Sequence, residues 1–279
     1  MRFLLFFMFL FLYGRAQHLI KGKVYDLQSK SGIAFVSIGV PGKTIGTVSD
    51  ETGNFILQLN AADEKDSLKF MVPGYKSKSV VVSGLTQNEN SSIGLEASAI
   101  VLEEIVVKPK HLKYKKLGAK NYSTTNCTGF ADGGNNWKGS EAAVLFHIER
   151  EVFLEYFAFY VIQNKYPDSI RFRLKFYKKI NNNWVGQLIA NKAVVFKIGI
   201  SKGEVKVPLG EFNIRMKEDF FVSLECLEDE LDIRKFCYSG SLKVPSYYKV
   251  KAFSKWHSTR GTGNGGGGAD FNLLVSYSN

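Results

Sequence analysis

The residues best suited to bind a ligand lie near the end of the chain, around its longest glycine run. Gly261 to Gly268 is too flexible to be ordered by its own side chains, as binding loops often are. Trp256 and Arg260 precede the run and Asp270 follows it, offering a stacking ring, a cation and a hydrogen-bond acceptor. Because the apolar faces of sugars stack on aromatic rings, we predict a glycan site in this region.

Further aromatic residues are expected near strand ends in the same half of the chain. The alternative for these rings is ordinary packing in the core or at hairpins, and the sequence leaves both interpretations open. The predicted ligand-binding residues are Trp256, Arg260, Asp270, Tyr247 and Trp184, with Trp137 and Tyr248 as further ring candidates.

The motifs for catalysis and for cofactor binding are missing. A zinc peptidase needs two histidines and a glutamate as ligands, and no His-Glu-x-x-His occurs among His18, His111, His147 and His257. Residues 261–266 match G-x-G-x-x-G, but the apolar alternation after them predicts a strand, whereas a dinucleotide site needs a helix there. We therefore predict no catalytic residue, no metal and no cofactor, although distant carboxylates could still converge as a glycosidase pair.

The chain has 279 residues, of which 45% are hydrophobic, 14% aromatic and 23% charged, a composition typical of globular proteins. Its formal net charge of +11 favours contact with anionic surfaces. Nucleic acid is not an expected partner, since the sequence has no recognition motif. The expected partners are a glycan or an envelope protein.

The N-terminus has the features of a signal peptide. Met1-Arg2 is followed by the apolar run Phe3 to Tyr13, and Gly14 and Ala16 fit a signal-peptidase site. The run is shorter than the roughly 20 residues that span a bilayer as a helix, so the mature chain is expected to have no transmembrane segment. We predict a signal peptide at residues 1–16 and secretion across the inner membrane, to the periplasm or the outer membrane. A retained N-terminal membrane helix is the alternative.

The elements that must position these residues are strands, because almost every periodic segment repeats every two residues. The pattern is clearest at 170–176, where Ile170, Phe172, Leu174 and Phe176 alternate with Arg171, Arg173 and Lys175. Similar alternation covers 194–200, 205–209, 220–224 and 271–277. The basic face of 170–176 is expected to be solvated or to contact anionic glycans. These patterns predict an all-β fold.

A lysine-rich segment divides the chain into two predicted domains. Residues 108–120 contain six lysines and no acidic residue, just after the apolar Ile105-Val106-Val107. We place a first β-sandwich at 17–107, a basic linker at 108–116 and a larger, jelly-roll-like sandwich at 117–279. Cys226 and Cys237 are expected on consecutive strands, where they either form a cross-strand disulfide or remain buried thiols.

Several motifs in the first domain occur in a fixed order. They are Ile20-Lys21-Gly22-Lys23-Val24-Tyr25-Asp26, Ile33 to Ile38, Gly46 to Phe55 and Pro73-Gly74-Tyr75-Lys76. Together they resemble the carboxypeptidase-regulatory-like domain, which implies a transthyretin-like or immunoglobulin-like sandwich common in Gram-negative envelope proteins. The rest of the chain resembles uncharacterised C-terminal β regions attached to this domain, which implies no activity.

The sequence therefore favours a non-enzymatic secreted envelope protein, in which the first domain is a scaffold or adaptor and the second carries a binding surface for glycans or surface partners. The alternative is a glycan-active hydrolase with carboxylates converging in the second sandwich. Two carboxyl groups about 5 to 10 Å apart in a cleft would favour the hydrolase, and a filled sheet face would favour the binding protein.

Overall fold

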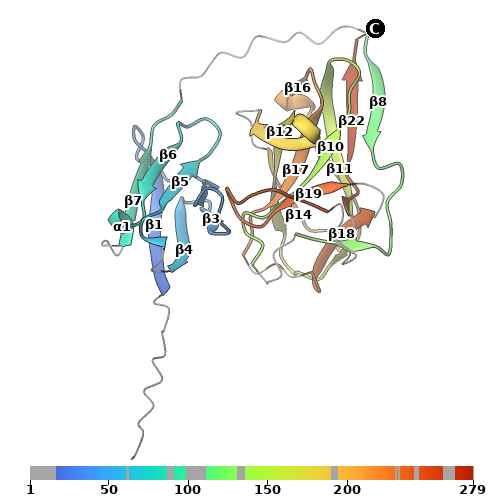
Figure 1. The fold of residues 1–279 in the computed structure, drawn as a ribbon. Helices are drawn as coiled ribbons and strands as arrows, with labels where there is room; N and C mark the ends of the chain where they lie inside the picture. The colour runs from blue at the N-terminus through green and yellow to red at the C-terminus, as the bar shows by residue number, and fades with distance from the viewer. Residues whose placement is uncertain are drawn as a thin grey trace, which may run out of the picture.

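A computed structural model describes residues 17–60, 63–86, 91–98, 111–130, 136–189, 194–229, 231, 233–241, 245–259 and 268–278. The predicted signal peptide, Arg260 and all of the glycine run except Gly268 lie outside these ranges. The described residues form two β-sandwiches, as predicted, with only short helices (Figure 1). None of the helices described in the structure is long and apolar enough to cross a membrane.

The first sandwich contains seven strands and one short helix. Their bounds are β1 (Gln17–Asp26), β2 (Ser37–Gly39), β3 (Gly46–Val48), β4 (Asn54–Asn60), β5 (Ser67–Met71), β6 (Lys78–Val81), α1 (Ser83–Thr86) and β7 (Ser91–Leu95). One sheet has the order β4-β1-β7, in which β1 and β7 run parallel, and the other has the order β3-β2-β5-β6. The inward residues of both sheets, such as Val24, Phe55 and Phe70, form one buried core.

The second sandwich contains the remaining strands. Their bounds are β8 (Lys113–Gly118), β9 (Cys127–Thr128), β10 (Glu141–Phe146), β11 (Val152–Asn164), β12 (Ile170–Ile180), β13 (Trp184–Leu188), β14 (Val194–Ile198), β15 (Gly203–Pro208), β16 (Arg215–Met216), β17 (Phe220–Cys226), β18 (Phe236–Ser241), β19 (Ser246–Lys249), β20 (His257–Ser258), β21 (Gly268–Ala269) and β22 (Asn272–Tyr277). Single turns of 3-10 helix lie at Asn181–Asn183 and Gly210–Phe212.

Two antiparallel sheets make up this larger sandwich. One has the order β13-β12-β17-β10-β19-β20, with β14 also paired to β12, and we call it the inner sheet. The face that this sheet turns away from the core of its own sandwich packs against the first sandwich, and we call it the outward face. The other has the order β21-β18-β11-β22-β8, with β15 and β16 also paired to β11 and β9 to β18. The long strands β10, β11 and β12 alternate between the sheets, and so do β17, β18 and β19. The aromatic rings of Phe157, Phe159 and Phe172 lie in the core between them.

The motif from Gly46 to Phe55 contains a turn at residues 50–53, where the Gly53 N–H donates a hydrogen bond of 3.2 Å to the carbonyl oxygen of Asp50. Gly53 has a φ of 86°, a value that side chains disfavour. Asp50 Oδ1 accepts hydrogen bonds from the backbone N–H groups of Thr52 and Asn54, both at 2.8 Å. Phe55 follows and is buried in the core.

The lysine-rich segment differs from the prediction at its C-terminal end. Residues 113–116 of the predicted linker belong to strand β8, which pairs with β22 along its whole length. The lysine side chains of β8 are exposed at the edge of the sheet, where lysine is common because it discourages pairing with other chains. Because this segment is rich in lysine, we predicted a linker where the chain forms a strand. The second domain therefore begins no later than Lys113. Residues 108–110 of the predicted linker lie outside the described part of the chain.

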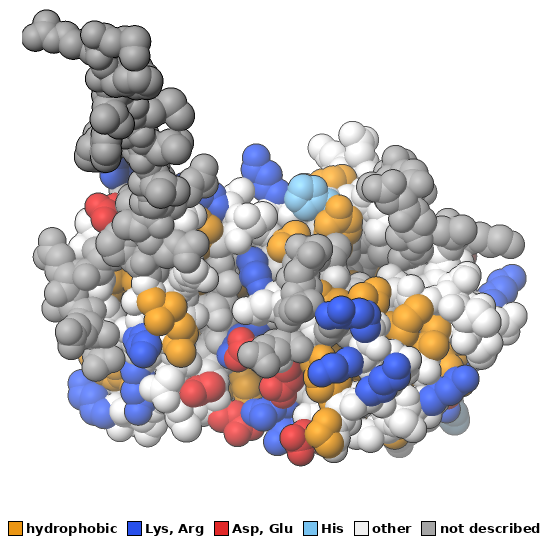
Figure 2. All heavy atoms as spheres, turned by 90° about the horizontal axis from the view of Figure 1, so that it is seen from below, with side chains coloured by type: hydrophobic (Ala, Val, Ile, Leu, Met, Phe, Trp, Pro, Cys, Tyr) orange, Lys and Arg blue, Asp and Glu red, His pale blue; other side chains and the backbone are white. Residues whose placement is uncertain are grey.

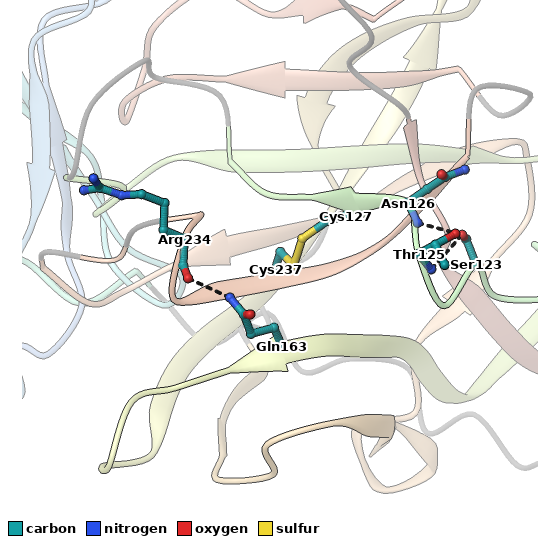
Figure 3. The surroundings of a disulfide bond; sticks show 7 residues. All are labelled: Ser123, Thr125, Asn126, Cys127, Gln163, Arg234 and Cys237. Atoms are coloured by element: carbon teal, nitrogen blue, oxygen red, sulfur yellow. Dashed lines mark hydrogen bonds between the residues drawn. A yellow bond between two sulfur atoms is a disulfide. The ribbon is translucent and has the colours of Figure 1, made fainter.

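The cysteine pairing is also different from the prediction. Cys237 forms a disulfide with Cys127, whose Cα atom is 5.6 Å away (Figure 3), and Cys226 is a buried free thiol. Strands β17 and β18 are consecutive in sequence but belong to opposite sheets, so Cys226 and Cys237 are not cross-strand neighbours. Cys127 lies instead on β9, which pairs directly with β18.

Candidate functional site

The outward face of the inner sheet carries a row of charged residues that crosses four strands. Arg173 of β12 lies opposite Glu225 of β17, Glu225 lies opposite Glu141 of β10, and Glu141 lies opposite Lys249 of β19. Lys175, two residues after Arg173, projects from the same face of β12. We call these five residues the ion cluster.

Every member of the ion cluster is buried and paired. Arg173 Nε is 2.5 Å from Glu225 Oε2, and Lys249 Nζ is 2.7 Å from Glu141 Oε1. Lys175 Nζ bridges both carboxylates, at 2.9 Å from Glu141 Oε1 and 2.8 Å from Glu225 Oε1. The exposed fraction of the Arg173 side chain is 1%, and the two glutamates have none. Buried charges are tolerated only when they are paired and hydrogen-bonded in this way.

Neighbouring hydroxyl groups complete the hydrogen bonds of Glu141. Tyr177 and Ser223 each donate a hydrogen bond of 2.7 Å to Glu141 Oε2. Burial, reinforced by the nearby carboxylates, raises the pKa of Tyr177 well above its ordinary value, so its phenol remains a donor. Burial alone would raise the pKa of Glu141, but Lys175 and Lys249 outweigh it and hold that pKa well below the ordinary value. Glu141 is therefore a carboxylate at neutral pH.

Residues of the first sandwich cover the ion cluster. Arg173 Nη1 donates a hydrogen bond of 2.5 Å to the carbonyl oxygen of Phe35, and Nη2 donates one of 2.9 Å to Ser37 Oγ. At the rim, Arg171 Nη1 is 2.6 Å from Glu51 Oε1. The guanidinium of Arg173 thus joins a glutamate of one sandwich to the backbone of the other. This arrangement corrects the expectation that the basic face of β12 is solvated or free for glycans.

A second contact between the sandwiches depends on glycine. Gly39 and Gly46 lie opposite each other on β2 and β3. A Cβ atom at either position would come within 2.8 Å of the carbonyl oxygen of Ala252, a residue of the second sandwich. Beside them, the Gly42 N–H donates a hydrogen bond of 2.9 Å to the carbonyl oxygen of Phe253. Backbone therefore packs directly on backbone at this end of the interface.

The ion cluster does not have the geometry of a glycosidase site. Glu141 and Glu225 converge in the second sandwich, but both are inaccessible to solvent and share Lys175. A glycosidase pair must reach the substrate and a water molecule. The arrangement is suited to holding the sheet face against the first sandwich.

A cleft of about 880 Å³ lies beside this interface. The first sandwich lines it with residues of β1, β3 and β4, and the second sandwich contributes Asn136, Lys138, Asp229 and Lys251. Lys138 Nζ is 2.8 Å from Asp229 Oδ2, so the second sandwich contributes an ion pair to the wall of the cleft. Of the predicted ligand-binding residues that the structure describes, none lines this cleft.

The structure brings three of the predicted ligand-binding residues to the inner sheet. The Trp184 ring lies 5.3 Å from that of Tyr247 in an edge-to-face contact, and 38% of Trp184 is exposed. Trp256 is half-buried, with its ring 5.5 Å from that of Tyr177 and 4.7 Å from Lys249 Nζ. Trp256 therefore covers one end of the ion cluster. Trp184 is the most exposed of the three rings.

The other predicted residues are elsewhere. Asp270 is buried and accepts a hydrogen bond of 2.6 Å from Ser239 Oγ, so its acceptor capacity is used inside the protein. Arg260 lies outside the described residues. Trp137 is buried against Phe130. In the described part of the chain no group of three or more histidine, cysteine, aspartate and glutamate residues is arranged to hold a metal ion.

The residues that complete the ion cluster were not recognised in the sequence. Glu141 and Glu225 each lie within an apolar strand segment, which is the one local signal that a buried cation must accompany them. Their cationic partners are between 34 and 108 residues away along the chain, and only the strand order shows which charges meet.

Comparisons with solved structures give only remote similarity. The chain matches a structure of the infectious bursal disease virus Gx strain at 9% identity with a TM-score of 0.23, covering 94% of this chain and 75% of that one. A crystal structure of the T13 particle of the same virus matches at 11% identity with a TM-score of 0.24, covering 94% and 73%. TM-scores this low do not establish a shared fold.

No curated protein matches the sequence significantly. One family model matches the part of the chain that forms the first sandwich. Residues 20–107 match the family described as the CarboxypepD_reg-like domain, so the N-terminal part of this chain is a domain of that family.

Proposed function

We propose that this chain is a secreted, non-enzymatic envelope protein, in which the CarboxypepD_reg-like sandwich is a fixed scaffold for a larger binding sandwich. The observation that carries this proposal is the ion cluster. Its convergent carboxylates are used to hold the two sandwiches together, and a docked scaffold presents the other surfaces of the second sandwich in one orientation.

Two features support export to the periplasm or the outer membrane. The apolar run before Gln17 has the length and flanks of a signal peptide. The Cys127–Cys237 disulfide suits an oxidising compartment. The intact mass of the exported protein tests the signal-peptide prediction. A chain beginning at Gln17 is expected, and retention of residues 1–16 would contradict removal of a signal peptide during export.

Glycans of the cell envelope are the proposed ligand class for the second sandwich. The supporting observation is the exposed Trp184 ring, which makes an edge-to-face contact with Tyr247 on the inner sheet. On the face of the molecule drawn in Figure 2, lysine and arginine side chains are spread among the other side chains, which favours anionic glycans. Exposed apolar side chains on that face are separated by these cations and form no single large patch.

The test measures binding and turnover on the same substrates. The mature protein is incubated with lipopolysaccharide and with peptidoglycan fragments, and both retained glycan and new reducing ends are measured. The proposal predicts retention without new reducing ends. Formation of reducing ends that persists through purification would instead support the glycan hydrolase, and retention of neither glycan would contradict the ligand class.

A further inference from the structure

One open end of the larger core is a part of the second sandwich that the proposed function does not use. β8 begins and β22 ends at this end of the sandwich (Figure 1). A cavity of about 60 Å³ lies there, lined by residues of both strands and of the loop between β10 and β11. Its floor is apolar, since Val152 and Val275 belong to the core and Ile148 and Leu117 pack against it. One water molecule needs roughly 10 to 15 Å³, so the cavity admits a group of several non-hydrogen atoms.

A lysine lies at this cavity on the side of β8 that faces the core. Lys115 pairs with Val275 and Leu117 pairs with Leu273, and directly paired residues of an antiparallel sheet lie on the same face. Val275 and Leu273 are core residues. The stem of Lys115 therefore starts beside apolar side chains, and because the residue is exposed, its ammonium group lies at the rim of the cavity.

Arg150 supplies a second cation from the loop between β10 and β11. Its guanidinium carbon lies over the ring of Tyr277, 5.1 Å from the ring centre. This contact uses the attraction of a cation for an aromatic ring, and the five N–H donors of the guanidinium remain suited to an anion. Tyr277 is two residues after Val275, the partner of Lys115, so both cations border the same stretch of β22.

The loop that carries Arg150 is anchored on both sides of that residue. Before it, Asp219 Oδ1 accepts a hydrogen bond of 2.9 Å from the Ile148 N–H. Burial acts to raise the pKa of Asp219, but hydrogen bonds led by that of Ile148 lower it to about 2, so this anchor is ionised at neutral pH. After it, Glu151 Oε1 lies 3.1 Å from Arg215 Nε. An anchored loop loses little conformational entropy when a ligand binds.

The rim of the cavity has an excess of positive charge. Lys115 and Arg150 form no ion pair with any residue that the structure describes. Glu149 is the one acidic residue among those described that lines the cavity, and it is exposed, while His147 completes the rim. Two cations and one carboxylate therefore surround an apolar floor.

We propose that this cavity binds a short aliphatic carboxylate, with the alkyl end on the apolar floor and the carboxylate held by Lys115 and Arg150. Hydrogen bonds from an arginine and a lysine are strengthened by the charge of a carboxylate. The apolar floor disfavours inorganic phosphate, because an anion with oxygens on every side would lose hydrogen bonds to water there. The small volume limits the alkyl end to a few carbon atoms. Trp184 and Tyr247 do not line the cavity, so this proposal goes beyond the glycan function.

The experiment titrates the mature, full-length protein with butyrate and measures binding by isothermal titration calorimetry. Formate, which lacks an alkyl end, and inorganic phosphate are titrated in parallel. The wild type is compared with Arg150→Gln, Lys115→Gln and Lys116→Gln. Lys116 is the matched control, since it is the exposed neighbour of Lys115 and lies on the opposite face of β8, paired with Leu274. Circular dichroism and melting curves verify that all three variants are folded.

We expect butyrate to bind saturably, and Arg150→Gln and Lys115→Gln each to weaken its binding about tenfold, as for the loss of a hydrogen bond to a charged group. Lys116→Gln should leave the affinity within about twofold of the wild type, and formate and phosphate should both bind more weakly than butyrate. Absence of saturable butyrate binding, equal weakening by Lys116→Gln, or phosphate binding as tight as that of butyrate would overturn the proposal. Glycan retention by Arg150→Gln is measured in parallel and is expected to equal that of the wild type, so failure of either proposal is distinguished from failure of the other.

Discussion

Arg173 is the residue on which the contact between the sandwiches depends most. Its guanidinium pairs with Glu225 and donates to Phe35 and Ser37 of the first sandwich. Five donors in a planar arrangement allow arginine to satisfy several acceptors at once, which lysine cannot reproduce. Loss of this side chain would leave Glu225 beside Lys175 alone, in a site closed to water.

Replacement of Arg173 by alanine is therefore expected to lower the free energy of unfolding by about 3 to 5 kcal/mol, as for other buried ion pairs that lose one partner. The matched control is Arg171→Ala, two residues earlier on the same face. Arg171 pairs with the exposed Glu51, and exposed pairs contribute about 0 to 1 kcal/mol. Urea denaturation of the two variants measures the difference, and equal losses would show that burial of Arg173 is not decisive.

Glu141 gives the ion cluster a defined response to acid. Its pKa is near 4.3 in an unfolded chain and well below its ordinary value in the folded protein. A group whose pKa is depressed by folding contributes stability above its unfolded pKa and loses that contribution as the pH falls toward its folded pKa.

The difference in stability between the wild type and Glu141→Gln should therefore be greatest near neutral pH and shrink once the pH falls below about 4.3. Urea denaturation midpoints measured from neutral pH to acid provide the test. A difference that stays constant through the acid range would show that the ionised form of Glu141 contributes nothing.

At the scale of single elements, the sequence predicted the period of β12 but not the environment of its basic face. Alternation showed that Phe172 and Leu174 point to the core and that Arg173 and Lys175 point the other way, and the structure confirms both. Which surface covers that face depends on strands more than 100 residues away in the first sandwich. Local periodicity cannot contain this information, because it reports only which side of a strand is apolar.

Because local periodicity does not show which distant strands meet, the sequence also did not predict which cysteines pair or which aromatic rings are in contact. Sequence proximity suggested Cys226 as the partner of Cys237, but the chain changes sheet between them. Trp184 and Tyr247 were predicted from residue type, and their contact across the inner sheet could be found only from the fold. Motif order did predict the first sandwich, because the turns and inward residues that define it are local.

The disulfide predicts a specific count of reactive thiols. Burial raises the pKa of the Cys226 thiol far above its ordinary value, so Cys226 should be unreactive in the native protein. Titration with a thiol reagent, without reductant, should give no reaction in the native state and one thiol in denaturant. Three reactive thiols in denaturant would contradict the Cys127–Cys237 pairing.

At the scale of the whole molecule, the two sandwiches form one unit. The interface combines the ion cluster, the close approach of Ala252 to two glycines, and the rim pair between Arg171 and Glu51. Gly46→Ala tests the second of these, because an added Cβ would meet the Ala252 backbone. We expect this variant to expose new tryptic sites at the interface while each sandwich keeps its strand signal in circular dichroism. An unchanged digestion pattern would mean that the backbone contact is not required.

A double-mutant cycle between Ser37 and Arg173 tests the docking of the sandwiches most directly, since each residue belongs to a different sandwich and the two share a hydrogen bond of 2.9 Å. Stability is measured by urea denaturation for the wild type, Ser37→Ala, Arg173→Lys and the double variant. A control cycle uses Ser37→Ala with Arg171→Ala, whose side chain pairs with Glu51 and Glu228. The docked arrangement predicts a coupling energy of about 0.5 to 3 kcal/mol for the first cycle and additivity for the control. Additivity within about 0.3 kcal/mol in both cycles would show that the two sandwiches do not meet at the ion cluster.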